Sequence, residues 1–182
     1  MKKLNKAVKI ISKVFEIIHW IGAALMAVTA IFSVPITQWL ENIINLNNLE
    51  SEVSAYGFEV SLVNSYGTIN TATLALFAIS SVIIYALVAM IFRNIYLIIK
   101  KSESDTPFNK DNIRMTREIG IFSIAIPVIG LIMSTILRLV VGVDVIETSV
   151  NLSGFVMGII VLCLTQFFAY GAELEKDVDG LL

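Results

Sequence analysis

The chain has 182 residues and a net charge of −2 at pH 7, and 57% of its residues are hydrophobic while only 15% are charged. This balance lies well outside the usual range for a soluble domain, and the length fits one domain. The single cysteine, Cys163, excludes an intrachain disulfide.

The apolar residues gather into four runs that reach or approach the roughly 20 residues a helix needs to cross a bilayer. In lipid, backbone N–H and C=O groups must bond within their own segment, so each run is predicted to be a helix. The expected spans are residues 14–34, 72–99, 119–141 and 152–172. We therefore expect an all-α integral membrane protein, a four-transmembrane-helix bundle that forms one domain over residues 1–182.

Lysine and arginine are distributed unevenly between the connecting segments. Five lysines precede the first span, and five basic residues lie in the connector, residues 100–118. The loops at residues 35–70 and 142–151 contain acidic residues and neither lysine nor arginine. By the positive-inside rule, we expect both termini and the connector in the cytoplasm and the two acidic loops outside.

Three polar residues fall within or near the first two spans. Glu16 and His19 have the Glu-x-x-His spacing of metal ligands in helical bundles, but such sites need that motif twice, and His19 is the only histidine. Pairing of Glu16 with Lys13 is the simpler interpretation. Arg93 lies seven residues before Lys100, about 10 Å deeper in the helix. A Glu16–Arg93 ion pair inside the bundle is our main structural expectation, and Glu16, His19 and Arg93 form the candidate intramembrane polar cluster.

The outer loop, residues 35–70, contains two predicted elements. After Pro35 the apolar residues recur at helical spacing, which predicts an amphipathic helix on the outer leaflet or capping the bundle. Further on, Phe58, Val60 and Leu62 alternate with other residues, and Asn64 to Gly67 is typical of a turn, so a short hairpin is expected. A loop of this length either binds something or covers the bundle.

The connector and the C-terminal tail contain local signals of their own. Thr106 precedes a proline and is therefore disfavoured in a helix, and Asn109 is a suitable cap for a helix that begins at Lys110 and continues into the third span. The tail, residues 173–182, is acidic and could dock on the basic connector or on a basic partner.

Proline and glycine mark the last two spans. Pro127 predicts a kink in the third span. Gly154 and Gly158 form a small-xxx-small pattern, which permits close helix packing. We expect this pattern to pack internally with the alanines of the first span, and a homodimer or larger homo-oligomer is the alternative.

The segment TPFNKDNIRMTREIG, followed by an apolar run, resembles a signature of the bacterial membrane family catalogued as domain of unknown function 2975. The ending FFAYGAELEKDVDGLL is similar to that family's ending, and Met115 and Thr116 interrupt the basic cluster of the signature. The matching positions are Pro107, Phe108, Asn112, Ile119 and Gly120, then Gly171, Glu173, Leu174 and Asp179. The resemblance implies a multi-pass protein of a bacterial cell membrane that associates with small helix-turn-helix regulators.

The candidate cytoplasmic contact combines the connector with the tail. Its residues are Pro107, Phe108, Asn112, Arg114, Arg117, Glu173, Asp177 and Asp179.

Three functions remain open at this point. The first is a membrane-embedded interaction or regulatory protein that binds a small cytoplasmic DNA-binding regulator and makes no direct contact with nucleic acid. The second is an oligomeric transporter or channel subunit whose polar path contains Glu16, His19 and Arg93. The third is a protective protein that binds an extracellular peptide at the outer loop. No pattern of a nucleophile beside a base, a phosphate-binding loop or a metal-ligand cluster is present, so we expect neither enzymatic activity nor a cofactor.

Overall fold

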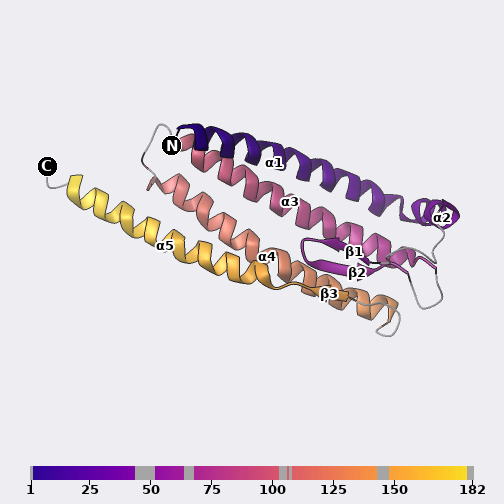
Figure 1. The fold of residues 1–182 in the computed structure, drawn as a ribbon. Coiled ribbons are helices and arrows are strands. Elements are labelled where there is room, and N and C mark those ends of the chain that lie inside the picture. Colours follow the sequence, from indigo (N-terminus) through magenta and orange to yellow (C-terminus); the bar gives the residue numbers. More distant parts are fainter. Residues whose placement is uncertain are drawn as a thin grey trace. The chain divides into compact units, whose positions relative to one another are not determined.

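The computed structural model describes residues 2–43, 52–63, 68–102, 106, 108–142 and 148–179 (Figure 1). Its elements, in chain order, are α1 (Lys2–Ile31), α2 (Ser33–Ile43), β1 (Glu52–Ala55), β2 (Phe58–Ser61), α3 (Thr71–Lys101), α4 (Lys110–Val141), β3 (Thr148–Val150) and α5 (Ser153–Asp179).

Four of these helices, α1, α3, α4 and α5, are long and apolar enough to cross a membrane. This confirms the four apolar helices predicted from hydropathy. The helix α1 ends at Ile31, three residues before the expected end of the first span, and α2 begins at Ser33. The predicted amphipathic helix of the outer loop is therefore present, and it starts two residues before Pro35.

A three-stranded sheet accompanies the helices, whereas the all-α fold that was predicted included at most a short hairpin. The three strands are antiparallel and lie in the order β1-β2-β3. A hairpin is present, but Tyr56 and Gly57 form its turn, with Ala55 opposite Phe58. Only its second strand, β2, lies in the segment that was predicted to form a hairpin. Both turn residues have positive φ, 51° and 85°, as in the tight turns that match strand twist. The predicted turn residues 64–67 lie outside the described residues, although an antiparallel bridge between Val63 and Ile69 brackets them.

The chain divides into two compact units. Unit 1 consists of residues 1–19, 87–125 and 153–182, and unit 2 consists of residues 20–86 and 126–152. Unit 1 therefore contains both ends of the chain and the connector, which were expected on one side of the membrane. Unit 2 contains both acidic loops, which were expected on the other side.

Unit 2 has its core where the sheet packs against α3 and α4. Phe58 and Val60 of β2 are 1% exposed, and they pack with Phe77 of α3 and Leu137 of α4. The rings of Phe58 and Phe77 are stacked, with centroids 5.8 Å apart. The third strand, β3, comes from the loop between α4 and α5, where no strand was predicted. The sheet thus joins two loops that are far apart in the sequence.

In unit 1 the helices contact one another in the order α1, α3, α4, α5. Phe15 of α1 stacks on Phe92 of α3 with ring centroids 5.0 Å apart. Two glycines allow α4 and α5 to approach closely, because a Cβ added to Gly158 would lie 2.7 Å from the carbonyl oxygen of Gly120. Gly158 therefore does pack internally, but its partner is Gly120 of α4 and not the alanines of α1.

We predict that Phe58→Ala destabilises the protein by about 3–5 kcal/mol, because it removes a large buried ring from the core of unit 2. Thermal unfolding in detergent, followed by circular dichroism, measures the effect. Phe167→Ala is the matched control, since Phe167 is 71% exposed. Equal unfolding temperatures for the two variants would contradict the assignment of Phe58 to the core.

Candidate functional site

The start of α4 is fixed by a local cap. The side-chain Oδ1 of Asn109 accepts a hydrogen bond from the backbone N–H of Asp111 at 2.8 Å. The backbone carbonyl of Asn109 accepts the first helical bond, from the N–H of Ile113. This confirms the predicted cap at Asn109 and the helix start at Lys110. The cap satisfies a backbone donor that the first turn of a helix otherwise leaves unpaired.

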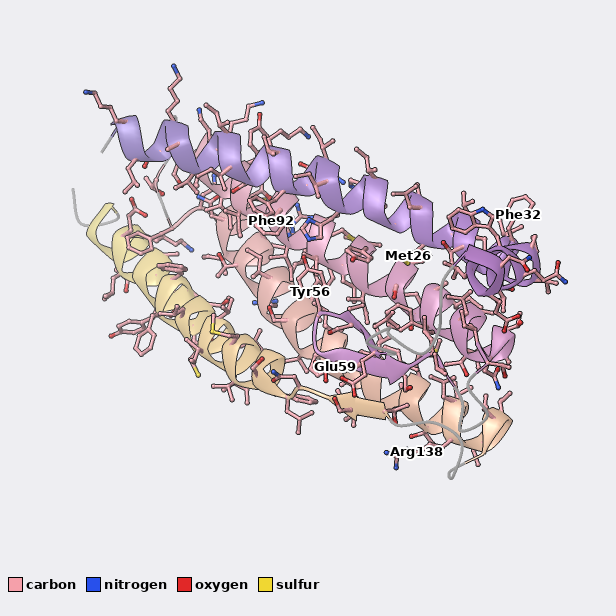
Figure 2. All side chains as sticks on the ribbon, turned by 45° about the vertical axis from the view of Figure 1, so that its right-hand side comes forward. Met26, Phe32, Tyr56, Glu59, Phe92 and Arg138 are labelled. Carbon is pink, nitrogen blue, oxygen red and sulfur yellow. The ribbon has the colours of Figure 1, made fainter. Side chains whose placement is uncertain are left out.

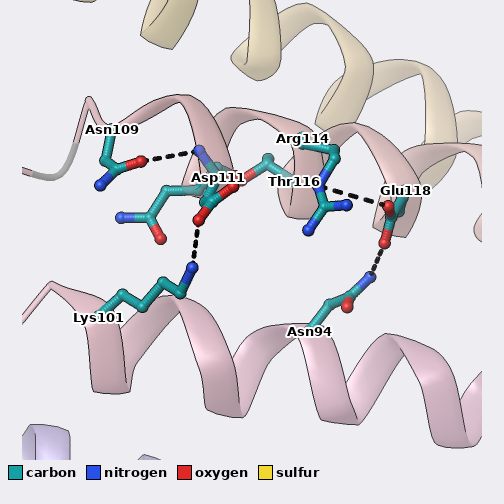
Figure 3. A network of polar contacts seen from close by, with 8 residues as sticks. Asn94, Lys101, Asn109, Asp111, Arg114, Thr116 and Glu118 are labelled. Atoms are coloured by element: carbon teal, nitrogen blue, oxygen red, sulfur yellow. Dashed lines mark hydrogen bonds and ion pairs between the residues drawn. The ribbon is translucent and has the colours of Figure 1, made fainter.

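Three polar links join the end of α3 to the start of α4, and we call them the polar seam. Figure 3 shows the links of Lys101 with Asp111 and of Asn94 with Glu118. Lys101 pairs with Asp111. The amide Nδ2 of Asn112, which is 2% exposed, donates to Ser102 Oγ at 3.2 Å. The members of the third link are Asn94 and Glu118, whose amide Nδ2 and carboxylate Oε2 lie 2.9 Å apart. The seam therefore holds residues 101 and 102 against the first turns of α4.

The ion pair between Lys101 and Asp111 lowers the pKa of the Asp111 carboxyl. The hydrogen bond from Lys101 and the positive charge of Lys101 hold the pKa of Asp111 below its ordinary value of 3.8, with a smaller contribution from Arg114. Asp111 lies in the connector, before the apolar segment that begins at Ile119. Because both side chains are partly exposed to solvent, the pair contributes little to stability.

We predict that Lys101→Met raises the pKa of Asp111 towards 3.8, because both of the largest causes of its lowering come from Lys101. A carboxyl whose pKa is lowered in the folded state stabilises that state above the unfolded pKa, and the contribution is lost as the pH falls through the folded pKa. Carbon-detected NMR titration of the Asp111 carboxyl below pH 5 measures the shift. Lys100→Met is the control and should leave the titration unchanged.

Phe108 attaches the connector to α5. A Cβ added to Gly171 would lie 2.8 Å from Phe108 Cε1, so only glycine leaves room for the ring at this position. The Phe108 ring also contacts Phe168, with centroids 6.2 Å apart. Gly171 and Phe168 are three residues apart on α5 and lie on one face of the helix. The connector motif and the C-terminal motif recognised in the sequence are therefore in contact through Phe108 and Gly171.

We predict that Gly171→Val displaces the Phe108 ring and increases amide hydrogen exchange at residues 108–113 at least several-fold. The double variant Phe108→Ala/Gly171→Val should recover part of the loss in thermal stability, because it removes the clash. A double-mutant cycle measures this coupling. Additive effects of the two substitutions would contradict direct packing of Phe108 on Gly171.

The first turns of α4 present a stripe of exposed basic side chains. Lys110, Arg114 and Arg117 are all exposed, and their spacings of four and three place them on one face of the helix. Arg114 lies 4.0 Å from Glu118, at the limit of an ion pair. No ion pair of Arg117 occurs within the described parts of the chain. We call these three residues the basic stripe.

The end of α5 presents acidic side chains instead. Glu173 and Asp177 are exposed, and neither makes an ion pair with a connector residue in the part of the chain that the structure describes. Docking of the tail on the connector, one of the two expected arrangements, is therefore not formed by these two residues. Acidic groups near a helix C-terminus oppose the helix dipole, so they do not stabilise α5. Pro107 and the side chain of Asp179 lie outside the described residues.

Two residues of the candidate intramembrane cluster, Glu16 and His19, are buried, whereas Arg93 is exposed. Glu16 and His19 are 7% and 4% exposed, but Glu16 pairs with Lys13 at 3.0 Å. His19 Nδ1 lies 2.6 Å from the carbonyl oxygen of Phe15, a bond that requires the tautomer with a proton on Nδ1.

The prediction of a Glu16–Arg93 ion pair is wrong. Arg93 is exposed, while Glu16 is buried beside Lys13. The physical reason is that the ring of Phe92 stacks on α1, and the next residue is rotated by about 100° around the helix axis. Among the described residues, no group of three or more His, Cys, Asp or Glu side chains could hold a metal ion.

Comparisons with models of protein families, with curated proteins and with solved structures found no match.

Proposed function

We propose that this chain is a multi-pass protein of a bacterial cell membrane, with α1, α3, α4 and α5 crossing the bilayer. The exposed apolar surface of the helices supports this proposal. In the most apolar 18-residue segment of each helix, only 17% of α1 and 11% of α5 is buried. Exposure of such continuous apolar faces to water is unfavourable. The exposed apolar residues on these two helices include Leu25, Val28, Ile31, Val156, Ile159 and Phe167.

Both termini and the connector lie in the cytoplasm in this proposal. The support is the uneven charge of the connecting segments, because lysine and arginine next to a span favour the cytoplasmic side. Unit 1 contains the lysines of α1 and the basic stripe, whereas the loops in unit 2 that were expected outside have no basic residue.

The function is the binding of a soluble cytoplasmic partner at the inner face, by contact and not by catalysis. The observation that carries this conclusion is that the basic stripe stands on a connector already ordered by the Asn109 cap, the polar seam and the Phe108 contact. A surface ordered before binding loses less conformational entropy when the partner docks. The exposed guanidinium groups of Arg114 and Arg117 are suited to carboxylates of a partner.

A small helix-turn-helix regulator is the proposed partner. The resemblance of the connector and the C-terminal segment to the family named above implies an association of this kind. The charges are complementary as well, because a DNA-binding domain carries a basic surface that Glu173 and Asp177 would attract. A regulator held by that surface is kept from DNA, so the membrane protein would control transcription by sequestration.

A transporter or channel subunit is less well supported. That role needs Glu16, His19 and Arg93 on one polar path. The exposed side chain of Arg93 and the aromatic packing of Phe92 around His19 argue against such a path.

Photo-crosslinking in native membranes tests the proposal. A benzoylphenylalanine replaces Arg117 in the basic stripe, and a second protein carries it in place of Phe32, which is 53% exposed in unit 2. We expect a small DNA-binding protein among the mass-spectrometry adducts of the first position and not of the second. Adducts only with lipid, or only with a second copy of the chain, would overturn the proposed partner.

The double variant Arg114→Gln/Arg117→Gln should then weaken binding of the captured regulator at least tenfold, or by about 1.4 kcal/mol. Arg93→Gln is the control, because it removes one positive charge from an exposed arginine outside the connector. Binding measured by biolayer interferometry on nanodiscs decides between specific contact and general attraction to positive charge. Equal losses in the two proteins would contradict a role for the basic stripe.

A further inference from the structure

The first strand of the sheet has an unpaired edge. Since a two-residue turn connects β1 and β2, Ala55 and Phe58 exchange both of their backbone hydrogen bonds, and the pattern repeats at every second residue. Val53 and Val60 therefore form the next such pair. The backbone N–H and C=O groups of Glu52 and Ser54 point away from β2.

The opposite edge of the sheet is closed by α4. The backbone carbonyl of Thr148 in β3 accepts a hydrogen bond from Arg138 Nη2 at 3.4 Å. The hydroxyl of Thr148 accepts from Arg138 Nε at 3.2 Å and lies 2.6 Å from Ser134 Oγ. For the outward backbone groups of Glu52 and Ser54, the described residues offer no comparable partner, and both side chains are exposed. An open strand edge of this kind is a template for another strand.

The exposed face of the sheet next to that edge is acidic. Successive side chains of a strand alternate between faces, so Glu52 and Ser54 of β1 share a face with Glu59 of β2. Glu59 accepts a hydrogen bond from Ser149 Oγ at 2.7 Å, which orients its carboxylate on this face. The whole outer loop, residues 35–70, contains no lysine or arginine. A strand added here would meet two carboxylates and no basic residue of this loop.

The hairpin is also held in place before any strand is added. Tyr56 at its tip (Figure 2) packs edge-on against Tyr85 of α3, with ring centroids 5.8 Å apart. The Tyr85 ring in turn fits against Gly22 of α1, where an added Cβ would lie 3.3 Å from Tyr85 Cδ1. A preordered edge reduces the entropic cost of binding.

From this geometry we propose that β1 binds an extended basic peptide by antiparallel strand addition. Residues of the peptide that bond to Glu52 and Ser54 lie directly opposite them, so their side chains fall on the acidic face. Those positions take lysine or arginine. The alternate positions lie on the same face as Val53 and Ala55 and take small apolar side chains. A second copy of this chain is a poorer occupant, because pairing two β1 strands would place the carboxylates of both copies on one continuous face.

This site lies in unit 2, and it does not depend on the partner proposed for the connector. It gives the outer loop a binding role of its own and specifies the class of peptide, an alternating basic and apolar strand.

The test uses the full chain in phosphatidylcholine nanodiscs and a fluorescein-labelled peptide, Lys-Val-Lys-Val-Lys-Val. Two further peptides carry N-methyl groups on the lysine residues only or on the valine residues only. They have equal charge and equal methylation, but only the first loses the N–H groups that would bond to β1. We expect fluorescence anisotropy to show at least tenfold weaker binding for the N-methyl-lysine peptide than for the N-methyl-valine peptide.

The variant Ser54→Pro tests the same contact from the protein side. Proline removes the outward N–H of Ser54, and an edge position whose N–H faces solvent tolerates it. We expect at least a tenfold loss of peptide binding, while hydrogen exchange at the paired amides of Val53 and Ala55 stays slow. If those amides exchange rapidly, the hairpin has opened, and the two methylated peptides on the unaltered protein decide the question.

Three results would overturn the proposal. The first is equal binding of the two methylated peptides, which would mean electrostatic adsorption only. The second is a loss confined to the N-methyl-valine peptide, which contradicts antiparallel pairing. The third is that the peptide does not bind while the chain dimerises, and that Ser54→Pro abolishes this dimerisation. That result would assign the β1 edge to a second copy of the chain.

Discussion

The pairing of α3 with α4 is the contact on which both units depend. In unit 1 the two helices are joined by the polar seam, in which Lys101 and Asn94 meet Asp111 and Glu118. In unit 2 the same two helices supply Phe77 and Leu137 to the core under the sheet. The first contact is polar and lies next to a turn, and the second is apolar and buried. The exposed polar links contribute little stability but are directional. The buried apolar contact supplies most of the stability, because it removes apolar surface from water.

This division also determines which surfaces remain for binding. In unit 1 the seam neutralises Asp111 with Lys101 and leaves Lys110 and Arg117 exposed. In unit 2 the core covers one face of the sheet, and Arg138 closes the β3 edge, so that the β1 edge and the acidic face remain open. Each proposed site thus lies on a surface that the local packing leaves exposed.

Much of the fold was predictable because its signals are local. The cap at Asn109 needs only the residues that follow it, and the hairpin was expected where Phe58 and Val60 alternate. The turn at Tyr56 and Gly57 was not predicted, because Tyr56 is not a residue type that favours positive φ. The predicted turn residues, 64–67, lie outside the described residues. The Glu16–Arg93 pair failed for a different reason. Depth along two helices can be read from sequence spacing, but the direction of each side chain around its helix depends on what the neighbouring residue packs against.

The sequence by itself determined the four apolar helices, the basic connector and the acidic loops, since hydropathy and charge act on each segment independently. Only the tertiary structure decided that Phe108 fits against Gly171, that Gly158 meets Gly120, and that β3 completes the sheet. These contacts join residues that are far apart in the sequence. Gly120 and Gly158 are 38 positions apart, and Phe58 and Val150 are 92 positions apart. Such pairs form only when whole helices and strands dock, because their free energy comes from complementary shape and burial, which no single segment contains.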